Sequence, residues 1–226
     1  EFDQELLAVI AEQSVTALRY LQLSGQQQQT ILSSIKLIGT LLQKQGSQAF
    51  KHAPVYFNIA NALAEQMHMS QKGIENLYYA SILQGAGALD VPYDILAKKS
   101  QLTSEEFKVI RDMPSRSAEL IRPVEFLKPV LPIILYHHEK YDGTGYPSGL
   151  KKEQIPLGAR IMSVVDAFEA MIQGRPYRKR LSVSEAVEEL KHNSGAQFDP
   201  KIVTAFCELY KDRRFRNFLQ QMRKGS

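Results

Sequence analysis

The sequence has only one cysteine, Cys207, among its 226 residues, which rules out a disulfide within the chain. Long apolar runs are missing as well, since a run such as residues 130–135 is far shorter than the ~20 residues that span a bilayer. The first residues lack the basic-then-apolar pattern of a signal peptide. These absences predict a chain that does not cross a membrane, and the cytoplasm is the expected compartment.

Charge of either sign is not in large excess, because 28 Lys and Arg residues stand against 24 Asp and Glu residues, for a net charge of +4. The basic residues gather in two clusters, at 175–180 and at 211–224. No nucleic-acid-binding motif and no aromatic stacking pattern accompany the second cluster, so binding to DNA or RNA is not expected. Residues 213–226 are interpreted as a solvated basic tail.

Alternation of the kind that marks β-strands is absent, whereas signals for helix starts are frequent. Residues 103–106 and 182–185 have the sequence of capping boxes. Pro114, Pro156 and Pro200 suit a first helical turn, where no amide hydrogen is needed. After Pro156, apolar residues at helical spacing predict one inward face: Ile155, Leu157, Ile161, Val164, Val165 and Phe168. The sequence therefore predicts an all-α helical bundle.

The N-terminal part differs from the rest, because residues 2–23 and 28–42 form two amphipathic segments joined by the polar linker 24–27. Neither segment carries a candidate metal ligand. One interpretation is a helical hairpin packed on the bundle, and the other is a homodimer contact or a coupling to a further regulatory domain. The predicted division is an N-terminal helical extension at 1–46, a main domain at 47–212 and the basic tail at 213–226.

The most informative stretch places two adjacent imidazoles directly before a glycine-rich loop, in the run His137-His138-Glu139-Lys140-Tyr141-Asp142-Gly143-Thr144-Gly145-Tyr146-Pro147. Two neutral imidazoles are natural nitrogen ligands for a transition metal. A loop rich in glycine suits unusual backbone angles that hold one aromatic hydroxyl in place. The pair needs partners from elsewhere in the chain to form a site.

This run resembles the signature of the HD-GYP family, a branch of the HD-superfamily phosphohydrolases that open cyclic di-GMP at a di- or trinuclear metal centre. Further motifs follow in the order of that family at 155–161, 165–170, 175–178 and 195–200, so the resemblance covers roughly residues 50 to 210. It implies metal-ligand positions at His52, His137, His138 and Asp166.

The same resemblance implies nucleotide and partner contacts. Residues at the positions of cyclic di-GMP contacts are Tyr146, Arg175, Arg178 and Lys179, since guanidinium groups fork onto phosphate oxygens. The Gly-Tyr-Pro surface of the family is associated with binding diguanylate cyclase domains of the GGDEF type. The residues of that surface are Asp142, Gly143, Gly145, Tyr146 and Pro147.

The chain departs from the family at its namesake dyad, because Gln84 stands in place of the histidine and Gly85 in place of the metal-bridging aspartate. A further ligand histidine is replaced by Met113. Glycine neither bridges metals nor polarises the attacking water. The remaining four ligand positions suit at most one zinc, iron or manganese ion, so a full centre is not expected and no residue is assigned as catalytic.

Three functional interpretations remain open at this point. The favoured one is an inactive domain that acts as a cyclic di-GMP receptor, a protein-interaction module or both. The second is a phosphodiesterase with an altered metal set, in which Glu139 or Asp142 is recruited. The third is a protein scaffold that binds neither nucleotide nor metal. The first is favoured because losing a bridging carboxylate costs more than losing an outer contact, which alone costs ~10–100-fold.

Overall fold

The structure is a computed structural model that describes residues 30, 33, 34, 37, 53–98, 100–173 and 180–224. The chain divides into two compact units, Glu1–Leu41 and Leu42–Ser226. The predicted N-terminal hairpin and its predicted dimer contact fall almost entirely outside the described residues. Four predicted site residues also lie outside them: His52, Arg175, Arg178 and Lys179.

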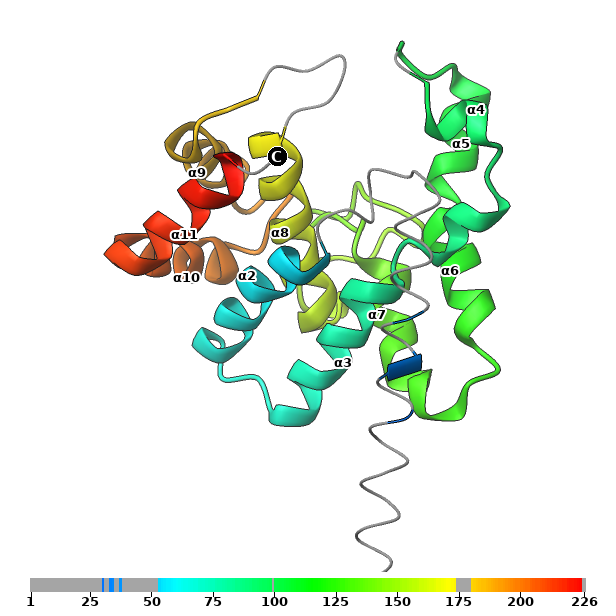
Figure 1. The fold of residues 1–226 in the computed structure, drawn as a ribbon, viewed down its shortest axis with the longest axis horizontal. Helices are drawn as coiled ribbons and strands as arrows, with labels where there is room; N and C mark the ends of the chain where they lie inside the picture. The colour runs from blue at the N-terminus through cyan, green and yellow to red at the C-terminus, as the bar shows by residue number, and fades with distance from the viewer. Residues whose placement is uncertain are drawn as a thin grey trace, which may run out of the picture. The chain divides into compact units, whose positions relative to one another are not determined.

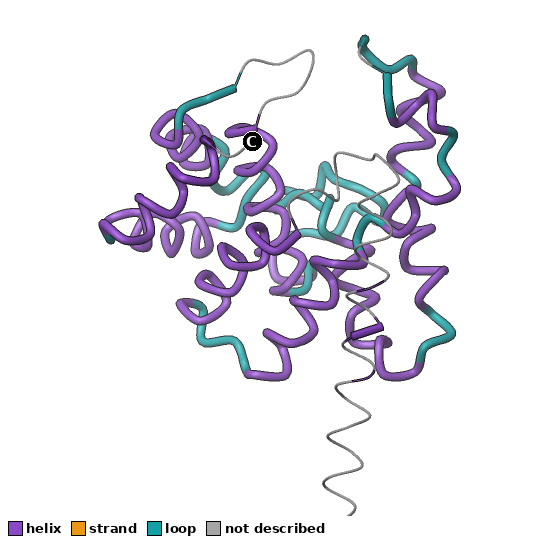
Figure 2. Tube along the Cα trace, in the orientation of Figure 1, coloured by secondary structure: helices purple, strands orange, loops and turns teal. Residues whose placement is uncertain are grey.

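The described part of the second unit consists of helices and connecting loops, with no β-strand (Figures 1 and 2), which confirms the predicted all-α class. The α-helices are α2 (Ala53–Gln66), α3 (Gln71–Leu83), α4 (Tyr93–Leu96), α5 (Ser104–Arg111), α6 (Met113–Ile121), α7 (Leu131–Tyr136), α8 (Leu157–Gln173), α9 (Val183–His192), α10 (Pro200–Lys211) and α11 (Arg213–Lys224). Short 3-10 helices are η2 (Ala86–Asp90), η3 (Glu125–Val130) and η4 (Lys152–Gln154). None of the described helices is long and apolar enough to cross a bilayer.

Helix α8 is the centre of this unit and contacts α2, α7, α9 and α10. Figure 1 shows α9, α10 and α11 on one side of α8 and α3, α6 and α7 on the other. The predicted inward face is confirmed, since five of its six residues are buried: Ile155, Ile161, Val164, Val165 and Phe168. Leu157, at the first position of α8, is only half-buried. Burying this apolar stripe fixes which way the polar residues of α8 point.

The predicted helix starts are confirmed in detail. In the first capping box the Thr103 hydroxyl accepts a hydrogen bond from the Glu106 amide at 3.3 Å, and the Glu106 carboxylate accepts one from the Thr103 amide at 2.7 Å. Residues 182–185 form the second box at the start of α9. Pro114 and Pro200 lie in the first turns of α6 and α10. Pro156 lies one residue before α8.

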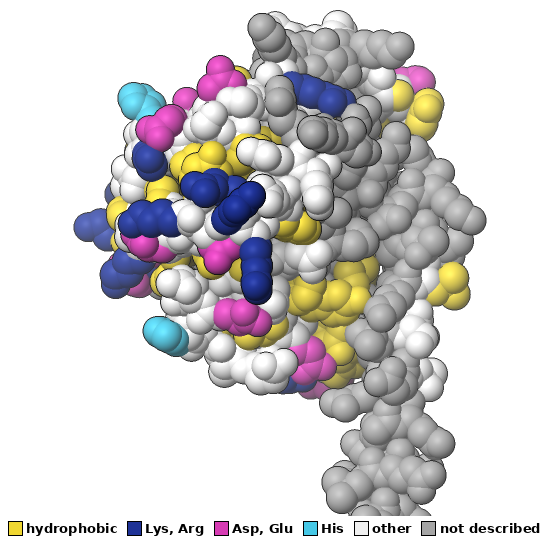
Figure 3. All heavy atoms as spheres, turned by 60° about the vertical axis from the view of Figure 1, so that its left-hand side comes forward, with side chains coloured by type: hydrophobic (Ala, Val, Ile, Leu, Met, Phe, Trp, Pro, Cys, Tyr) yellow, Lys and Arg dark blue, Asp and Glu magenta, His cyan; other side chains and the backbone are white. Residues whose placement is uncertain are grey.

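The C-terminal basic segment is a packed helix, unlike the solvated tail that the sequence predicted. Leu219 of α11 is fully buried, and the ring of Phe215 lies 6.0 Å from that of Phe206 on α10. Exposed basic residues such as Arg213 and Arg214 occupy the outer side. Figure 3, which brings the α9–α11 side forward, shows several Lys and Arg side chains on this surface. The prediction failed because an amphipathic basic segment has the same pattern whether or not a neighbour covers its apolar face.

Candidate functional site

The two adjacent histidines follow directly after α7. His137 is 5% exposed, and its Nδ1 lies 2.6 Å from the carbonyl oxygen of Ile134. Because a carbonyl can only accept, Nδ1 carries the proton in this contact and Nε2 is the nitrogen with a lone pair. Burial lowers the pKa of His137, which favours the neutral ring. The ring of His138 lies 4.0 Å from that of His137.

The glycine-rich loop folds back and places Tyr146 against the second histidine. The Tyr146 and His138 rings are 5.1 Å apart with an angle of 30° between their planes. The guanidinium of Arg111, the last residue of α5, lies 4.6 Å from the centre of the Tyr146 ring, a cation–π contact. The loop, α5 and the histidine pair are therefore connected by ring contacts.

Glycine is required at two positions of this loop. A Cβ atom on Gly145 would lie 2.2 Å from the backbone nitrogen of Lys140, so only glycine allows this close approach. Gly143 has a φ angle of +84°, which side-chain-bearing residues seldom adopt. The prediction of an unusual backbone angle is confirmed at Gly143, whereas Gly145 is required for a close approach that the sequence did not predict.

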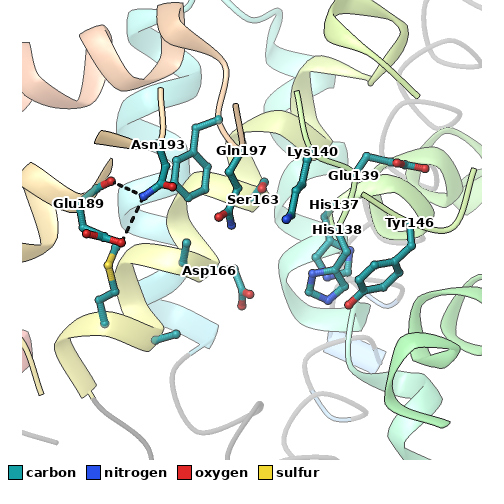
Figure 4. Close-up of a pocket in the computed structure, with 14 residues that line it drawn as sticks. His137, His138, Glu139, Lys140, Tyr146, Ser163, Asp166, Glu189, Asn193 and Gln197 are labelled. Atoms are coloured by element: carbon teal, nitrogen blue, oxygen red, sulfur yellow. Dashed lines mark hydrogen bonds between the residues drawn. The ribbon is translucent and has the colours of Figure 1, made fainter. Parts of the chain in front are cut away.

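Two acidic residues hold the loop in shape. Glu139 is 2% exposed, and its Oε1 accepts a hydrogen bond of 2.6 Å from the Ser148 amide. Asp142 accepts hydrogen bonds from the amide and the hydroxyl of Thr144 at 2.8 and 2.7 Å, and these bonds lower its pKa. In Figure 4 the Glu139 carboxylate points away from Asp166. Both contacts are structural, which argues against recruitment of these carboxylates as replacement metal ligands.

The histidine pair and Tyr146 face Asp166 across a pocket of ≈ 400 Å³ (Figure 4). Asp166 comes from α8, where Ser163 and Ala170 also line the pocket because they lie one helical turn away on the same face. Four of the predicted site residues are thus brought together: His137, His138, Tyr146 and Asp166. Arg160, which lies one to two turns before Asp166 on α8, forms an ion pair with Asp199.

Several pocket residues were not singled out from the sequence: Lys140, Ser163, Glu189, Asn193 and Gln197. Two signals in the sequence could have indicated two of them: Ser163 lies one helical turn before Asp166, and Lys140 lies two residues after His138. The other three come from the end of α9 and the turn that follows it. That turn is hydrogen-bonded to the glycine-rich loop after the histidine pair, which is called the signature loop from here on. The amides of Tyr141 and Asp142 donate to the carbonyls of Gln197 and Ala196 at 3.1 and 2.9 Å.

Residues 84–87, where the family resemblance predicts the dyad, are well packed. Gln84 caps the C-terminus of α3, and its carbonyl oxygen accepts a hydrogen bond of 2.7 Å from the Ser117 hydroxyl. The same hydroxyl accepts one of 2.7 Å from the Gly87 amide. A Cβ atom on Gly87 would lie 2.3 Å from the Met113 carbonyl oxygen, so this backbone sits directly against α6. These contacts fix the backbone of the segment against α6.

The donors in the described part do not fit a di- or trinuclear metal centre. Gly85 has no side chain, and the buried Oε1 of Gln84 has no hydrogen-bond partner among the described residues. In the same part of the chain, no three His, Cys, Asp or Glu side chains come close enough together to hold an ion. By the family resemblance, the bridging carboxylate that such centres need is expected at position 85, where this chain has glycine.

A second carboxyl lies close to Asp166 on α8. Burial and the nearby charge of Asp166 raise the pKa of Glu169 to about 8. Glu169 therefore stays neutral at pH 7, and its Oε1 accepts a hydrogen bond of 2.8 Å from the side-chain amide of Gln173. Near neutral pH Glu169 therefore adds no negative charge to this region.

Comparison with known proteins defines the class. The HD-domain family pattern matches residues 22–202, so the chain belongs to the HD-domain family. A cyclic di-GMP phosphodiesterase of Thermotoga maritima is 31% identical over 79% of this chain and 49% of that protein. A cyclic di-GMP phosphodiesterase response regulator of Xanthomonas campestris is 36% identical over 66% of this chain and 40% of that protein. The chain thus spans half or less of the length of these two relatives.

A solved structure supports the fold. The crystal structure titled as a cyclic GMP-AMP specific phosphodiesterase of Vibrio cholerae has a TM-score of 0.60 and 21% identity, and the match covers 79% of this chain and 49% of that chain. At this identity the likeness concerns the fold, which is the HD-type helical bundle that the sequence predicted.

Proposed function

We propose that this chain binds a cyclic dinucleotide, with cyclic di-GMP as the first candidate, and does not hydrolyse it. In this role it is a receptor or regulatory interaction module of cyclic di-GMP signalling. The proposal is supported by a contrast between the dyad positions and the rest of the site. Gln84 and Gly85 occupy the dyad positions, whereas the histidine pair, Tyr146 and Asp166 still line one pocket. The relatives named as cyclic di-GMP phosphodiesterases support the choice of ligand.

The side chains available as metal ligands do not support hydrolysis. Phosphodiester hydrolysis in this family depends on a metal-activated water, and a carboxylate that bridges two metals keeps both in place. Gln84 is neutral, Gly85 has no side chain and Met113 offers only a weak thioether acceptor. The single ion predicted at His52, His137, His138 and Asp166 remains a prediction, and one ion does not replace a bridged centre.

Cationic and aromatic groups that need no metal support binding of a cyclic dinucleotide. In Figure 4 the amine of Lys140 points into the pocket, between the histidine pair and Asp166. Within the described part of the chain, this amine forms no ion pair, so it is available to a phosphate oxygen. A hydrogen bond to a charged group contributes ~1.5–3 kcal/mol. By the family resemblance, Arg175, Arg178 and Lys179 would add further phosphate contacts.

The first experiment combines elemental analysis of the purified protein with calorimetric titration of cyclic di-GMP and a hydrolysis assay with added Mn²⁺ or Fe²⁺. One metal or none per chain, micromolar or tighter binding and no turnover would support the proposal. Two or more metals with turnover would instead establish the altered phosphodiesterase. No binding of cyclic di-GMP would favour the third interpretation, a protein scaffold that binds neither nucleotide nor metal.

A pair of lysine variants sharpens this experiment. Lys140→Met should weaken cyclic di-GMP binding about tenfold, as expected for loss of one charged hydrogen bond. Lys128→Met serves as the matched control, because Lys128 is an exposed residue of η3 that pairs with Glu125. Equal affinities for the two variants would count against a phosphate contact at Lys140.

Binding of a GGDEF-type diguanylate cyclase domain is a second candidate function that is compatible with the first. It is favoured by the exposure of Asp142 and Pro147, which belong to the predicted partner surface of the loop. A titration with a purified diguanylate cyclase domain would test it, with Pro147→Ala as the variant. An affinity that this change leaves untouched would place any contact elsewhere.

A further inference from the structure

The pocket has a polar end that the function described so far does not use. Glu189, Asn193 and Gln197 line it, and in Figure 4 Glu189 and Asn193 lie on the far side of Asp166 from the histidine pair. We propose that Glu189 and Gln197 read the Watson–Crick edge of a purine base, that Asn193 positions Glu189, and that Glu189 selects guanine over adenine. This inference rests on the proposed function, because it names the part of the nucleotide that the pocket distinguishes.

The chemistry follows from the hydrogen-bonding groups of the two bases. Guanine presents two adjacent donors, N1–H and the N2 amino group, and a carboxylate accepts both at once. Adenine presents a lone pair at N1, which repels a carboxylate. The O6 atom of guanine is an acceptor and suits a side-chain amide such as that of Gln197. A carboxylate next to a side-chain amide therefore matches guanine and disfavours adenine.

Helix stability does not explain the place of Glu189. It lies in the last turn of α9, where the helix dipole disfavours a negative charge. Its neighbour Glu188 is paired with Lys191 at 2.7 Å, whereas none of the described Lys and Arg residues forms an ion pair with Glu189. The half-buried Glu189 carboxylate accepts a hydrogen bond from Asn193, and no ion pair among the described residues balances its charge, which suits a ligand with matching donors.

The side chains of Glu189 and Asn193 and the backbone of Gln197 are held in place before a ligand arrives. The side-chain amide of Asn193 donates to the carbonyl oxygen of Glu189 at 2.9 Å and to its Oε1 at 3.2 Å. The backbone amide of Gln197 donates to the Asn193 carbonyl at 3.0 Å, and the Gln197 carbonyl accepts from the Tyr141 amide at 3.1 Å. The base-reading end is thus fixed to the same loop that carries Tyr146, which lowers the ordering cost of binding.

The size and layout of the pocket suit one half of a cyclic dinucleotide. Its volume of ≈ 400 Å³ lies within the ~300–1,000 Å³ of small-molecule sites. In Figure 4, Lys140 and Asp166 lie between the polar end and the histidine pair. A phosphate bound by Lys140 would leave one base to reach Glu189 and the remainder of the ligand to lie toward Tyr146.

The test compares three ligands by calorimetry: cyclic di-GMP, 3′3′-cyclic GMP-AMP and cyclic di-AMP. The parent chain should prefer the two guanine-containing ligands over cyclic di-AMP. Glu189→Gln, which keeps size and removes charge, should reduce that preference about ten- to a hundredfold, the range expected for one bidentate base contact. Gln197→Ala should reduce it less, by about three- to tenfold. Glu188→Gln, one residue away and exposed, is the matched control and should change nothing.

The outcomes separate this inference from the function on which it rests. Binding by the parent with a ligand preference that Glu189→Gln leaves unchanged would overturn the base-reading role alone. Equal weakening of all three ligands by Glu189→Gln, at an unchanged melting temperature, would also overturn it. If the parent binds none of the three ligands, the proposed receptor function fails, and the inference fails with it.

Discussion

The guanidinium of Arg160 forms an ion pair with the carboxylate of Asp199, whose side chain is fully buried. Arg160 also donates to the carbonyl oxygen of Ile155 at 2.8 Å, and Asp199 accepts from the Lys201 amide at 2.8 Å. The pair therefore links the start of α8 to the start of α10. Both helices, together with the turn between α9 and α10, position the pocket.

Arg160→Met should destabilise the fold strongly, because it leaves the buried charge of Asp199 without its partner. Loss of one member of a buried pair typically costs ~3–5 kcal/mol. The free energy of unfolding from urea titrations checks this. Lys191→Met is the control, since it breaks the exposed pair with Glu188 and should cost below ~1 kcal/mol. Similar losses for the two variants would show that the buried pair has no special weight.

Gly145→Ala should disturb the signature loop, because the new Cβ atom would meet the backbone nitrogen of Lys140 at 2.2 Å. We expect a loss of ~1–3 kcal/mol in stability and weaker nucleotide binding, since Tyr146 follows directly. Thermal unfolding and calorimetry measure both effects. Gly149→Asn is the matched change, because Asn tolerates the positive φ of 68° and the nearest atom is 3.5 Å away. A tolerated alanine at 145 would refute the close-approach argument.

Restoring the family's ligands should restore metal binding. In the triple variant Gln84→His, Gly85→Asp and Met113→His, we expect the metal content to rise to about two ions per chain and hydrolysis of cyclic di-GMP to appear. The backbone permits this change, since Gly85 has a φ of −90°, which aspartate readily adopts. Elemental analysis and a turnover assay are the measurements.

The control for the restored site carries Asn in place of Asp at position 85. Its amide is close in size to the carboxylate but uncharged, so it should not hold a second ion. A folded triple variant with no more metal than the parent would contradict the view that the dyad positions limit the site.

Stability should depend on pH through Glu169. In the unfolded chain this carboxyl ionises near its ordinary pKa of 4.5, whereas in the folded chain its pKa is about 8. Stability therefore falls as the pH rises from about 4.5 to about 8 and levels off above that range. Glu169→Gln removes this dependence and should be more stable than the parent above pH 8, by up to about 5 kcal/mol at 1.36 kcal/mol per pKa unit.

Urea unfolding of the parent and Glu169→Gln at pH 5, 7 and 8.5 measures this difference. The gap between the two proteins should be small at pH 5 and grow with pH. Glu188→Gln, an exposed change on α9, should show no such growth. A constant gap would mean that Glu169 ionises normally in the folded chain.

Local signals predicted much of the fold. The capping box at Thr103 and Glu106 is confirmed because its hydrogen bonds close within four residues and need no distant partner. The inward face of α8 is confirmed for the same kind of reason, since helical spacing alone places Ile161, Val165 and Phe168 on one side. The packed state of α11 was missed, because burial of Leu219 depends on a neighbour that the segment itself does not encode.

For the site, the sequence by itself determined the available chemistry: two adjacent imidazoles, a loop that needs Gly143 and Gly145, and no carboxylate at position 85. Only the tertiary structure decided which side chains share one pocket. Glu189 and Gln197 reach it because the turn after α9 is hydrogen-bonded to the signature loop and α8 is buried between its neighbours. The physical reason is that contacts between segments far apart in the chain depend on how whole helices pack, and no local spacing records that packing.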